Sequence, residues 1–265
     1  MTNYANEGVM ALIRYKEFLR NDSLYKDFSA ELFFSNESTT ILNNLNEKLP
    51  YFENLISVRH KLFLDEINIW LKKKEASQIV SLGSGYCTCI LDFILNYSIS
   101  GFEVDKEEVL ITKKKILGSK YLPICIPFDF NDFSQDLIKY LQLNGFNISK
   151  CSIIFMEGLL YYLEDDAISY LFSSILNFLK ETKSILIFDM QVGESKLTDI
   201  QKEETNRYNI KNNYKNFSYW MEMINNSGLF LAKFSNIGAV DIWNRLEDNW
   251  ELITSSFFVV SYKEV

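Results

Sequence analysis

The stretch IVSLGSGYC, residues 79–87, joins an apolar run to two closely spaced glycines. This pattern is typical of a buried strand that ends in a tight turn before a helix. The free backbone N–H groups and the positive dipole end of such a helix can receive a phosphate or a carboxylate. The stretch therefore predicts a nucleotide-type ligand site in an α/β domain, although the glycines alone leave the ligand open.

The chain around this stretch alternates short β-rich runs with helical segments. The expected strands are QIVSL, SISGFEV, LPICIPF, CSIIFM and SILIFDM, and the expected helices cover residues 88–97, 106–117, 133–143 and 165–180. Five apolar strands that alternate with helices predict a parallel, doubly wound sheet. Two later runs, LFLAKFSN and SSFFVVSYK, predict an antiparallel hairpin at one edge of that sheet.

Two further segments are expected to cover the sheet domain. Residues 1–75 read as amphipathic helices, including a long one at residues 54–74, and form a helical cap on the domain at residues 76–265. The polar stretch at residues 191–216 has few apolar anchors, which favours a lid-like insert. We expect the cap and the insert to form a mobile cover over the ligand.

Composition restricts the possible partners. A chain of 265 residues with 48% hydrophobic content can bury one sizeable core. The net charge of −8 opposes binding to a phosphate backbone, so no nucleic acid partner is expected. No apolar run approaches the ~20 residues of a spanning helix, so we expect a cytoplasmic protein without a membrane partner.

Cysteine and histidine usage narrows the chemistry. Four scattered cysteines are too few for a disulfide framework, so reduced thiols are expected. The single histidine, His60, leaves little room for a serine or cysteine triad or for a His-rich metal site. We therefore expect no metal, and most hydrolase mechanisms become unfavourable.

An acidic residue at a fixed distance from the glycine turn points to the ligand. Asp105 ends the run GFEVD, 20 positions after Gly85, where a carboxylate can accept hydrogen bonds from both ribose hydroxyls. Thr88 replaces the third small residue of the dinucleotide fingerprint, and about 75 residues precede the turn. These departures favour S-adenosylmethionine over NAD. The alternative is structural, with glycines that only turn the chain and an Asp105 that caps the next helix.

Five ordered segments resemble a known family. VRHKLFLDE, VSLGSGYCT, FEVDKEEVLITKKKIL, PFDFND and FMEGLLYYL, within residues 27–189, are similar to successive motifs of the leucine carboxyl methyltransferase family, which includes bacterial polyketide O-methyltransferases. The resemblance implies a class I, Rossmann-like methyltransferase fold, with a seven-stranded, mostly parallel sheet and S-adenosyl-L-methionine as cofactor.

The resemblance also implies roles for individual residues. Arg59 matches an arginine that pairs with the methionine carboxylate, and Glu157 an acid near the methionine amine. The remaining cofactor contacts that it implies are Gly83, Ser84 and Gly85 at the turn, Asp105 and Lys106 at the ribose, Asp129 and Phe130 at the adenine, and Gly158 after the fourth strand. The candidate catalytic residues are Glu157, Tyr161 and Asp27.

The sequence departs from the family beside the cofactor. Cys87, Thr88 and Cys89 stand where the family usually has Asp-Thr-Arg, and Arg59, His60 and Lys61 replace a basic-Thr-Arg run. This divergence suggests a specialised member. Aromatic residues of the cap, the fourth-strand motif and the insert are candidates for the acceptor wall: Phe18, Tyr25, Phe28, Phe33, Phe34, Tyr161, Tyr162, Tyr208 and Tyr214.

The leading hypothesis is therefore a cytoplasmic methyltransferase that acts on a small natural product or a modified peptide, in secondary-metabolite biosynthesis. The acceptor group is a carboxyl, a hydroxyl or an amine. Two alternatives stay open, a protein C-terminal carboxyl methyltransferase and an NAD-dependent oxidoreductase. The sequence leaves the oligomeric state open.

Overall fold

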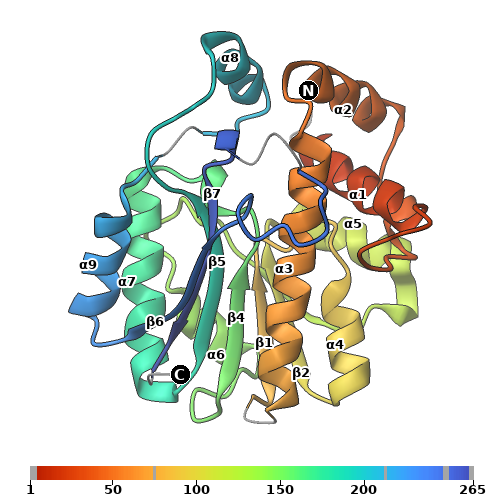
Figure 1. The fold of residues 1–265 in the computed structure, drawn as a ribbon. Coiled ribbons are helices and arrows are strands. Elements are labelled where there is room, and N and C mark those ends of the chain that lie inside the picture. The colour runs from red at the N-terminus through yellow and green to blue at the C-terminus, as the bar shows by residue number, and fades with distance from the viewer. Residues whose placement is uncertain (1–4, 74–75, 212–213, 247–250, 263–265) are drawn as a thin grey trace.

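The computed structural model describes residues 5–73, 76–211, 214–246 and 251–262 (Figure 1). Parts of the expected cap, insert and final loop, at residues 1–4, 74–75, 212–213 and 247–250, lie outside the described residues, as do residues 263–265. No helix within the described ranges has the length and apolar character that crossing a bilayer requires.

The described strands form one seven-stranded sheet in the order β3-β2-β1-β4-β5-β7-β6. The strands are β1 (Gln78–Leu82), β2 (Ser100–Asp105), β3 (Ile124–Pro127), β4 (Ser152–Met156), β5 (Ile185–Gln191), β6 (Phe230–Asn236) and β7 (Ser255–Ser261). The first five are parallel, and β7 runs antiparallel between β5 and β6. This arrangement confirms the predicted doubly wound sheet with an antiparallel hairpin at one edge.

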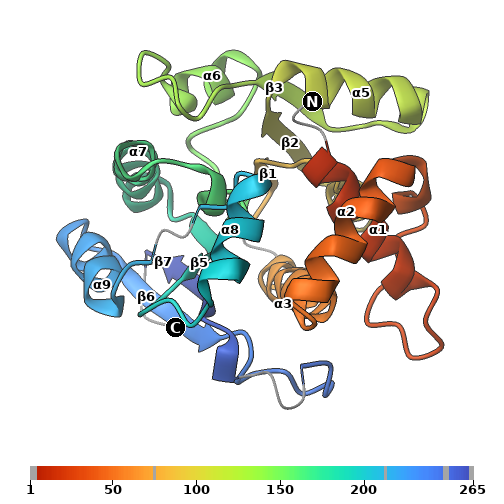
Figure 2. The same cartoon turned by 90° about the horizontal axis from the view of Figure 1, so that it is seen from above.

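Helices cover both faces of the sheet. Every residue of β1, β4 and β5 is therefore buried. The long helices are α1 (Ala5–Phe18), α2 (Asn36–Lys48), α3 (Phe52–Lys72), α4 (Cys89–Tyr97), α5 (Glu107–Leu117), α6 (Leu137–Leu143), α7 (Asp165–Thr182), α8 (Asp199–Arg207) and α9 (Phe217–Asn226). Seen from above, α6, α7 and α9 lie on one side of the sheet and α3 on the other (Figure 2).

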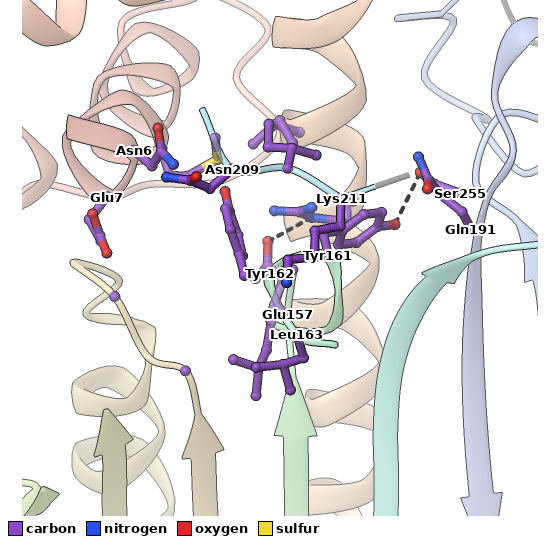
Figure 3. A pocket seen from close by; sticks show the side chains of 18 of the residues that line it. Asn6, Glu7, Glu157, Tyr161, Tyr162, Leu163, Gln191, Asn209, Lys211 and Ser255 are labelled. Atoms are coloured by element: carbon purple, nitrogen blue, oxygen red, sulfur yellow. Dashed lines mark hydrogen bonds and ion pairs between the residues drawn. The ribbon is translucent and has the colours of Figure 1, made fainter. Parts of the chain in front are cut away.

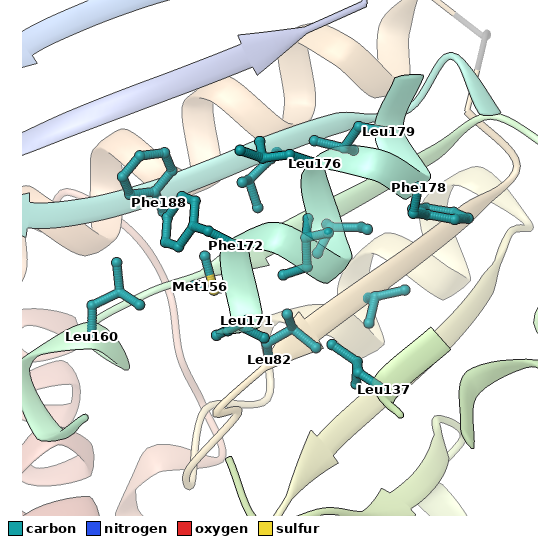
Figure 4. Close-up of a cluster of buried hydrophobic side chains, with 14 of the residues drawn as sticks. Leu82, Leu137, Met156, Leu160, Leu171, Phe172, Leu176, Phe178, Leu179 and Phe188 are labelled. Carbon is teal, nitrogen blue, oxygen red and sulfur yellow. The ribbon is translucent and has the colours of Figure 1, made fainter. Parts of the chain in front are cut away.

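Alternate side chains of each strand therefore enter two separate cores. In β5, Leu186 and Phe188 pack with α7 and α9, whereas Ile185 and Ile187 pack in the core that includes α3. On the first side, the ring centroid of Phe172 of α7 lies 5.0 Å from that of Phe188 (Figure 4). It lies 5.2 Å from that of Trp220. The two cores hold the sheet rigid, so that its carboxyl end is a fixed platform for a site.

Helix α6 and strand β3 are shorter than the sequence predicts. Helix α6 begins at Leu137 and not at residue 133, because the Asp136 side chain accepts a hydrogen bond from the Lys139 N–H and caps the helix there. The residues before it form a turn in which Asp132 accepts hydrogen bonds from Ser134. Strand β3 covers Ile124–Pro127, whereas the expected strand LPICIPF covers residues 122–128.

We expect Phe172→Ala to lower the free energy of unfolding by about 3–5 kcal/mol, because it removes a fully buried ring and leaves a cavity. Urea unfolding followed by circular dichroism measures the change. Leu143→Ala is the control, since Leu143 is 74% exposed and its loss should leave stability nearly unchanged. Equal effects of the two substitutions would contradict the assignment of this core.

Candidate active site

A cavity of about 520 Å³ lies at the carboxyl ends of the parallel strands. Its wall includes residues that follow β1 to β5, others that precede β7, and side chains of α1, α3 and the segment around α8. Ligands of open α/β sheets collect at this end. Twelve site residues were predicted from the sequence, and all of them except Asp27 line this cavity.

The glycine turn has the backbone geometry that only glycine adopts readily. Gly83 and Gly85 have φ angles of +67° and +48°. A Cβ on Gly83 would lie 2.8 Å from a methyl carbon of Leu159, so the turn and the segment after β4 approach closely only without a side chain there. The Gly83 N–H donates to Val104 O at 2.8 Å, which extends the β1–β2 pairing into the turn.

Asp105 is fixed against this turn. Its Oδ2 accepts a hydrogen bond from the Gly85 N–H at 2.7 Å, and its Oδ1 accepts one from the Lys106 N–H at 2.7 Å. Burial raises the pKa of the Asp105 carboxyl above its usual range. Two N–H donors orient the carboxylate toward the cavity, and each oxygen keeps a lone pair for a ligand hydroxyl.

A buried ion pair holds the turn from behind. Lys113 of α5 is fully buried, and its Nζ lies 2.5 Å from Glu103 Oε2. The same ammonium donates to Cys87 O at 2.7 Å and to Ser84 Oγ at 3.4 Å. Tyr121 also donates its hydroxyl to Glu103. One cation therefore connects β2, α5 and both ends of the segment from Ser84 to Cys87.

The opposite side of the cavity carries a second charged cluster. Arg59 Nε lies 3.3 Å from Glu157 Oε1, and Arg59 Nη1 lies 3.5 Å from Asp189 Oδ2. His60 Nδ1 lies 2.8 Å from Glu157 Oε2. The Gly158 N–H donates to Asp189 Oδ1 at 2.7 Å. Helix α3 thus meets the ends of β4 and β5 through alternating charges, with Glu157 in the cavity wall (Figure 3).

The surroundings of Glu157 decide its protonation. Burial by itself favours the neutral acid, but His60 and Arg59 outweigh it and hold the pKa of Glu157 down at about 2. Burial opposes the charged form of His60 as well, yet the Glu157 carboxylate raises the pKa of its ring above the ordinary value. Glu157 is therefore a fixed anion at neutral pH, suited to bind an ammonium group.

Asp27 does not line the cavity. Its Oδ2 lies 2.9 Å from Arg14 Nε, and its Oδ1 accepts hydrogen bonds from Ser29 and from the Ala30 N–H. Arg14 lines the cavity and donates to Tyr86 O at 2.8 Å. The contact of Asp27 with the site thus runs through Arg14, and its catalytic role stays a prediction.

The residues that depart from the family sequence include a thiol in the cavity wall. A hydrogen bond from Cys89 lowers the pKa of Cys87 to about 6, against burial and with help from Arg14 and His60. Cys87 lines the cavity, whereas Cys89 begins α4. Both cysteines are free thiols.

Helices α1, α2 and α8 make contacts across the top of the cavity. Asn6 Nδ2 donates to Tyr208 O at 2.5 Å, and Gln201 Nε2 donates to Lys48 O at 2.9 Å. In Figure 1, α8 and α2 lie above the same end of the sheet. The segment around α8 and the N-terminal helices therefore contact each other at this end of the sheet.

The predicted aromatic wall is only partly present. Tyr161, Tyr162 and Tyr214 line the cavity. The others lie outside it: Phe18, Tyr25, Phe28, Phe33, Phe34 and Tyr208. Several of these pack on neighbours of the site instead, such as Tyr25, whose ring centroid lies 4.7 Å from that of His60.

Sequence reasoning missed three acidic or basic residues at the site. Glu7 of α1 lines the cavity, and burial, with Asp105 adding to it, raises its pKa to about 7. Asp189 lies in β5 beside Arg59, and Lys113 lies under the glycine turn. The position of Asp189 near the end of an apolar strand was a usable signal, whereas Glu7 and Lys113 read as ordinary charges of amphipathic helices.

The cavity at the carboxyl end of the sheet combines the glycine turn, the Asp105 carboxylate and the charged Glu157. This combination is typical of an α/β protein that binds a nucleoside. The profile of the leucine carboxyl methyltransferase family matches residues 8–176, more than half of the chain. The chain therefore belongs to the leucine carboxyl methyltransferase family. It is a class I methyltransferase, and its cofactor is S-adenosylmethionine. A search of curated proteins found no match.

Solved structures with the same fold share little sequence with this chain. A DUF574 family protein from Streptomyces avermitilis superposes with a TM-score of 0.72 at 10% identity, covering 97% of each chain. A putative methyltransferase from Thermobifida fusca gives a TM-score of 0.66 at 15% identity, covering 88% of this chain and 90% of the other. At such identities the likeness establishes the fold alone.

The cavity suits the cofactor at both ends. Asp105 and the orphaned Oε2 of Glu7, which has no hydrogen-bond partner among the described residues, are acceptors suited to ribose hydroxyls. Arg59 and Glu157 offer one positive and one negative group, as the zwitterionic methionine end requires. Gly158 has a φ of +72°, and a Cβ there would lie 3.0 Å from Arg59 Nη2, so a side chain at this position would strain the backbone and crowd the Arg59 guanidinium.

We expect Glu157→Gln to lower the free energy of unfolding in a pH-dependent way. A carboxyl whose folded pKa is depressed stabilises the protein above its ordinary pKa, and that stability is lost as the pH falls. The difference between parent and variant should thus be largest above pH 4.5 and vanish as the pH falls to about 2. Its maximum is about 3 kcal/mol, at about 1.4 kcal/mol per pH unit.

Urea unfolding at stepped pH measures this difference, with Glu181→Gln as the control because Glu181 is an exposed carboxylate at the end of α7. A pH-independent loss in Glu157→Gln would mean that the effect comes from packing and not from the charge.

A second expectation concerns the ion pair under the turn. Lys113→Met alone should destabilise the protein by about 3–5 kcal/mol, because it leaves Glu103 as an unpaired buried charge. Adding Glu103→Leu should restore most of the stability, since two apolar residues can replace a buried pair. The double variant should still bind S-adenosylhomocysteine more weakly than the parent, because Cys87 O and Ser84 Oγ lose their donor. Calorimetry measures the affinity, and parental affinity in a stable double variant would contradict the support role of Lys113.

Proposed function

We propose that this methyltransferase transfers the methyl group of S-adenosylmethionine to a small natural product or a modified peptide, in a secondary-metabolite pathway. The observation that carries the proposal is the extent of the cavity. It continues from the Glu157 cluster to Gln191 of β5 and Ser255 of β7, beyond the residues suited to the cofactor. Side chains of the insert, such as Ile210, line this further part.

The cofactor-binding roles follow from the charges and the turn. Asp105 and Lys106 hold the ribose, and Asp129 and Phe130 border the adenine. Gly83, Ser84 and Gly85 let the backbone approach the cofactor closely. Arg59 pairs with the methionine carboxylate, and Glu157 with the methionine ammonium. These pairings fix the direction of the sulfonium.

The chemistry asks mainly for alignment and exclusion of water. The bound cofactor supplies a methyl group on a positively charged sulfur, which is already activated for in-line displacement. Aligning two reactants contributes on the order of 7 kcal/mol or more in well-oriented systems. The contacts of Asn6 with Tyr208 and of Lys48 with Gln201 close the cover that keeps water out.

Proton transfer depends on the acceptor group. A carboxylate acceptor needs no base, whereas a hydroxyl or a protonated amine must lose a proton. Glu157 is too acidic for that role at neutral pH, because its pKa lies at about 2. Burial raises the pKa of Tyr161 well above its usual range, so its phenol stays protonated. Tyr161 therefore acts as a hydrogen-bond donor.

A covered cavity favours a small acceptor over a folded protein. A protein C-terminal carboxyl methyltransferase needs a broad docking face for the protein that carries the tail. Here α1 and the segment around α8 both contribute to the wall of the cavity and contact each other. The family assignment sets aside the NAD-dependent alternative.

The test is the binding of S-adenosylhomocysteine. At a concentration 100 times its dissociation constant, it should stabilise the folded protein by about 2.7 kcal/mol, read as a thermal shift. Asp105→Ala should abolish most of this shift without unfolding the protein. Asp166→Ala, which removes an exposed acid in the first turn of α7, is the matched control and should behave like the parent. No shift in the parent, together with no heat of binding in calorimetry, would refute the proposed function.

A further inference from the structure

The carboxyl end of β5 presents a buried amide that no cofactor role uses. Gln191 lines the cavity and is only 8% exposed. Its Oε1 has no hydrogen-bond partner anywhere in the described part of the chain. Buried polar atoms in folded proteins are almost always paired, so an unpaired buried oxygen on a residue of the cavity wall indicates a site for a donor from a bound molecule.

A hydroxyl stands beside this amide. Gln191 and Ser255 are directly opposite each other in the antiparallel β5–β7 pair, which places their side chains on the same face of the sheet. Ser255 Oγ accepts the Tyr161 hydroxyl proton at 3.1 Å (Figure 3). A serine that accepts one bond keeps its own proton to donate, and the described residues supply no acceptor for it. The pair thus offers one acceptor and one donor, side by side.

Two basic residues of the described cavity wall are linked to this end. Arg59 pairs with Asp189 of β5, and the Lys211 N–H donates to Tyr161 O, whereas the other basic residues of the wall are Arg14, His60 and Lys106. Arg59 is paired with Glu157 and Asp189, and Lys211 with Glu164. An acceptor that carries a carboxylate at this position would find no free cation. An uncharged polar group fits the site better.

Apolar side chains surround the polar pair. Leu197 of the insert and Leu252 and Ile253, which precede β7, line the same cavity. Hydrogen bonds tie these two segments together, since the Val192 N–H donates to Thr254 O at 2.9 Å and Lys196 Nζ donates to Glu251 O. Gln191 and Ser255 therefore lie in a wall to which these segments also contribute apolar side chains.

We propose that Gln191 and Ser255 bind an amide group of the methyl acceptor, with the amide N–H donating to Gln191 Oε1 and its carbonyl accepting from Ser255. The acceptor is then an uncharged, amide-bearing molecule with an apolar body. This inference rests on the proposed function. It also agrees with the sheet order, because β5 and β7 lie about 5 and 10 Å beyond β4, where Glu157 faces the cofactor.

Three small probes of nearly equal shape test the proposal: N-methylbenzamide, methyl benzoate and benzoate. The first donates and accepts, the second is neutral without a donor, and the third is an anion. Each is titrated by protein-observed NMR, with and without saturating S-adenosylhomocysteine. Dissociation constants on the order of 1 mM are expected for molecules of this size. N-methylbenzamide should bind at least about fivefold more tightly than methyl benzoate, as one hydrogen bond predicts.

Two variants test whether Gln191 causes the preference for the amide over the ester. Gln191→Met keeps the length of the side chain and removes the hydrogen bond, so the ratio of the two affinities should fall to about one, with unchanged affinity for S-adenosylhomocysteine. Gln142→Met is the matched control, since Gln142 is exposed on α6 and its change should preserve the parental ratio.

Four results of the probe titrations would overturn the proposal. They are equal binding of amide and ester to the parent, tightest binding of benzoate, a parental ratio in Gln191→Met, and no binding of any probe. Loss of S-adenosylhomocysteine affinity in Gln191→Met would also overturn it, because Gln191 would then serve the cofactor. Failure of the parent to bind S-adenosylhomocysteine refutes the proposed function instead, and the titrations without cofactor keep the two results apart.

Discussion

The site depends on one buried guanidinium. Arg59 projects from α3 between Glu157, which follows β4, and Asp189 of β5, so a single cation compensates two acids at neighbouring strand ends. Without it, two carboxylates would lie close together away from water, which is unfavourable unless one is protonated. Arg59 thereby fixes the position of α3 against the sheet. It also leaves Glu157 charged and in the cavity wall.

The glycine turn depends on a second buried cation, Lys113, which lies behind the turn and is not part of the cavity wall. Lys113 pairs with Glu103 and donates to the turn from behind, while Gly83 and Gly85 supply the backbone conformation in front. The two glycines thus give the turn its backbone conformation, and the charged Lys113–Glu103 pair holds it in place. This division explains how the cradle persists although Cys87 and Cys89 replace the family's charged residues, because the support comes from α5 and not from the turn's own side chains.

The cap and the insert contribute a different kind of specificity. Arg14, held by Asp27, and Glu7 bring charge from α1 to the cofactor end, whereas the segments around α8 and before β7 bring apolar side chains to the other end. Most charged side chains of the cavity wall thus come from α1, α3 and the strand ends, whereas the segments around α8 and before β7 contribute mainly apolar and uncharged polar side chains, with Gln191 and Ser255 beside them.

The sequence by itself determined the features that short-range patterns encode, namely the order of strands and helices and some residues at the strand ends. The strand and helix alternation, the glycine turn and Asp105 one helix later follow from periodicity and spacing, because parallel strands bring their carboxyl ends to one edge. The resemblance to the family added Arg59 and Glu157. Only the tertiary structure decided that Asp27 holds Arg14, that Glu7 joins Asp105, that Lys113 supports the turn, and that Gln191 faces Ser255 across β5 and β7. These partners lie far apart in the chain or on elements that pair only in the folded state, so their burial and pairing depend on packing that no local pattern records.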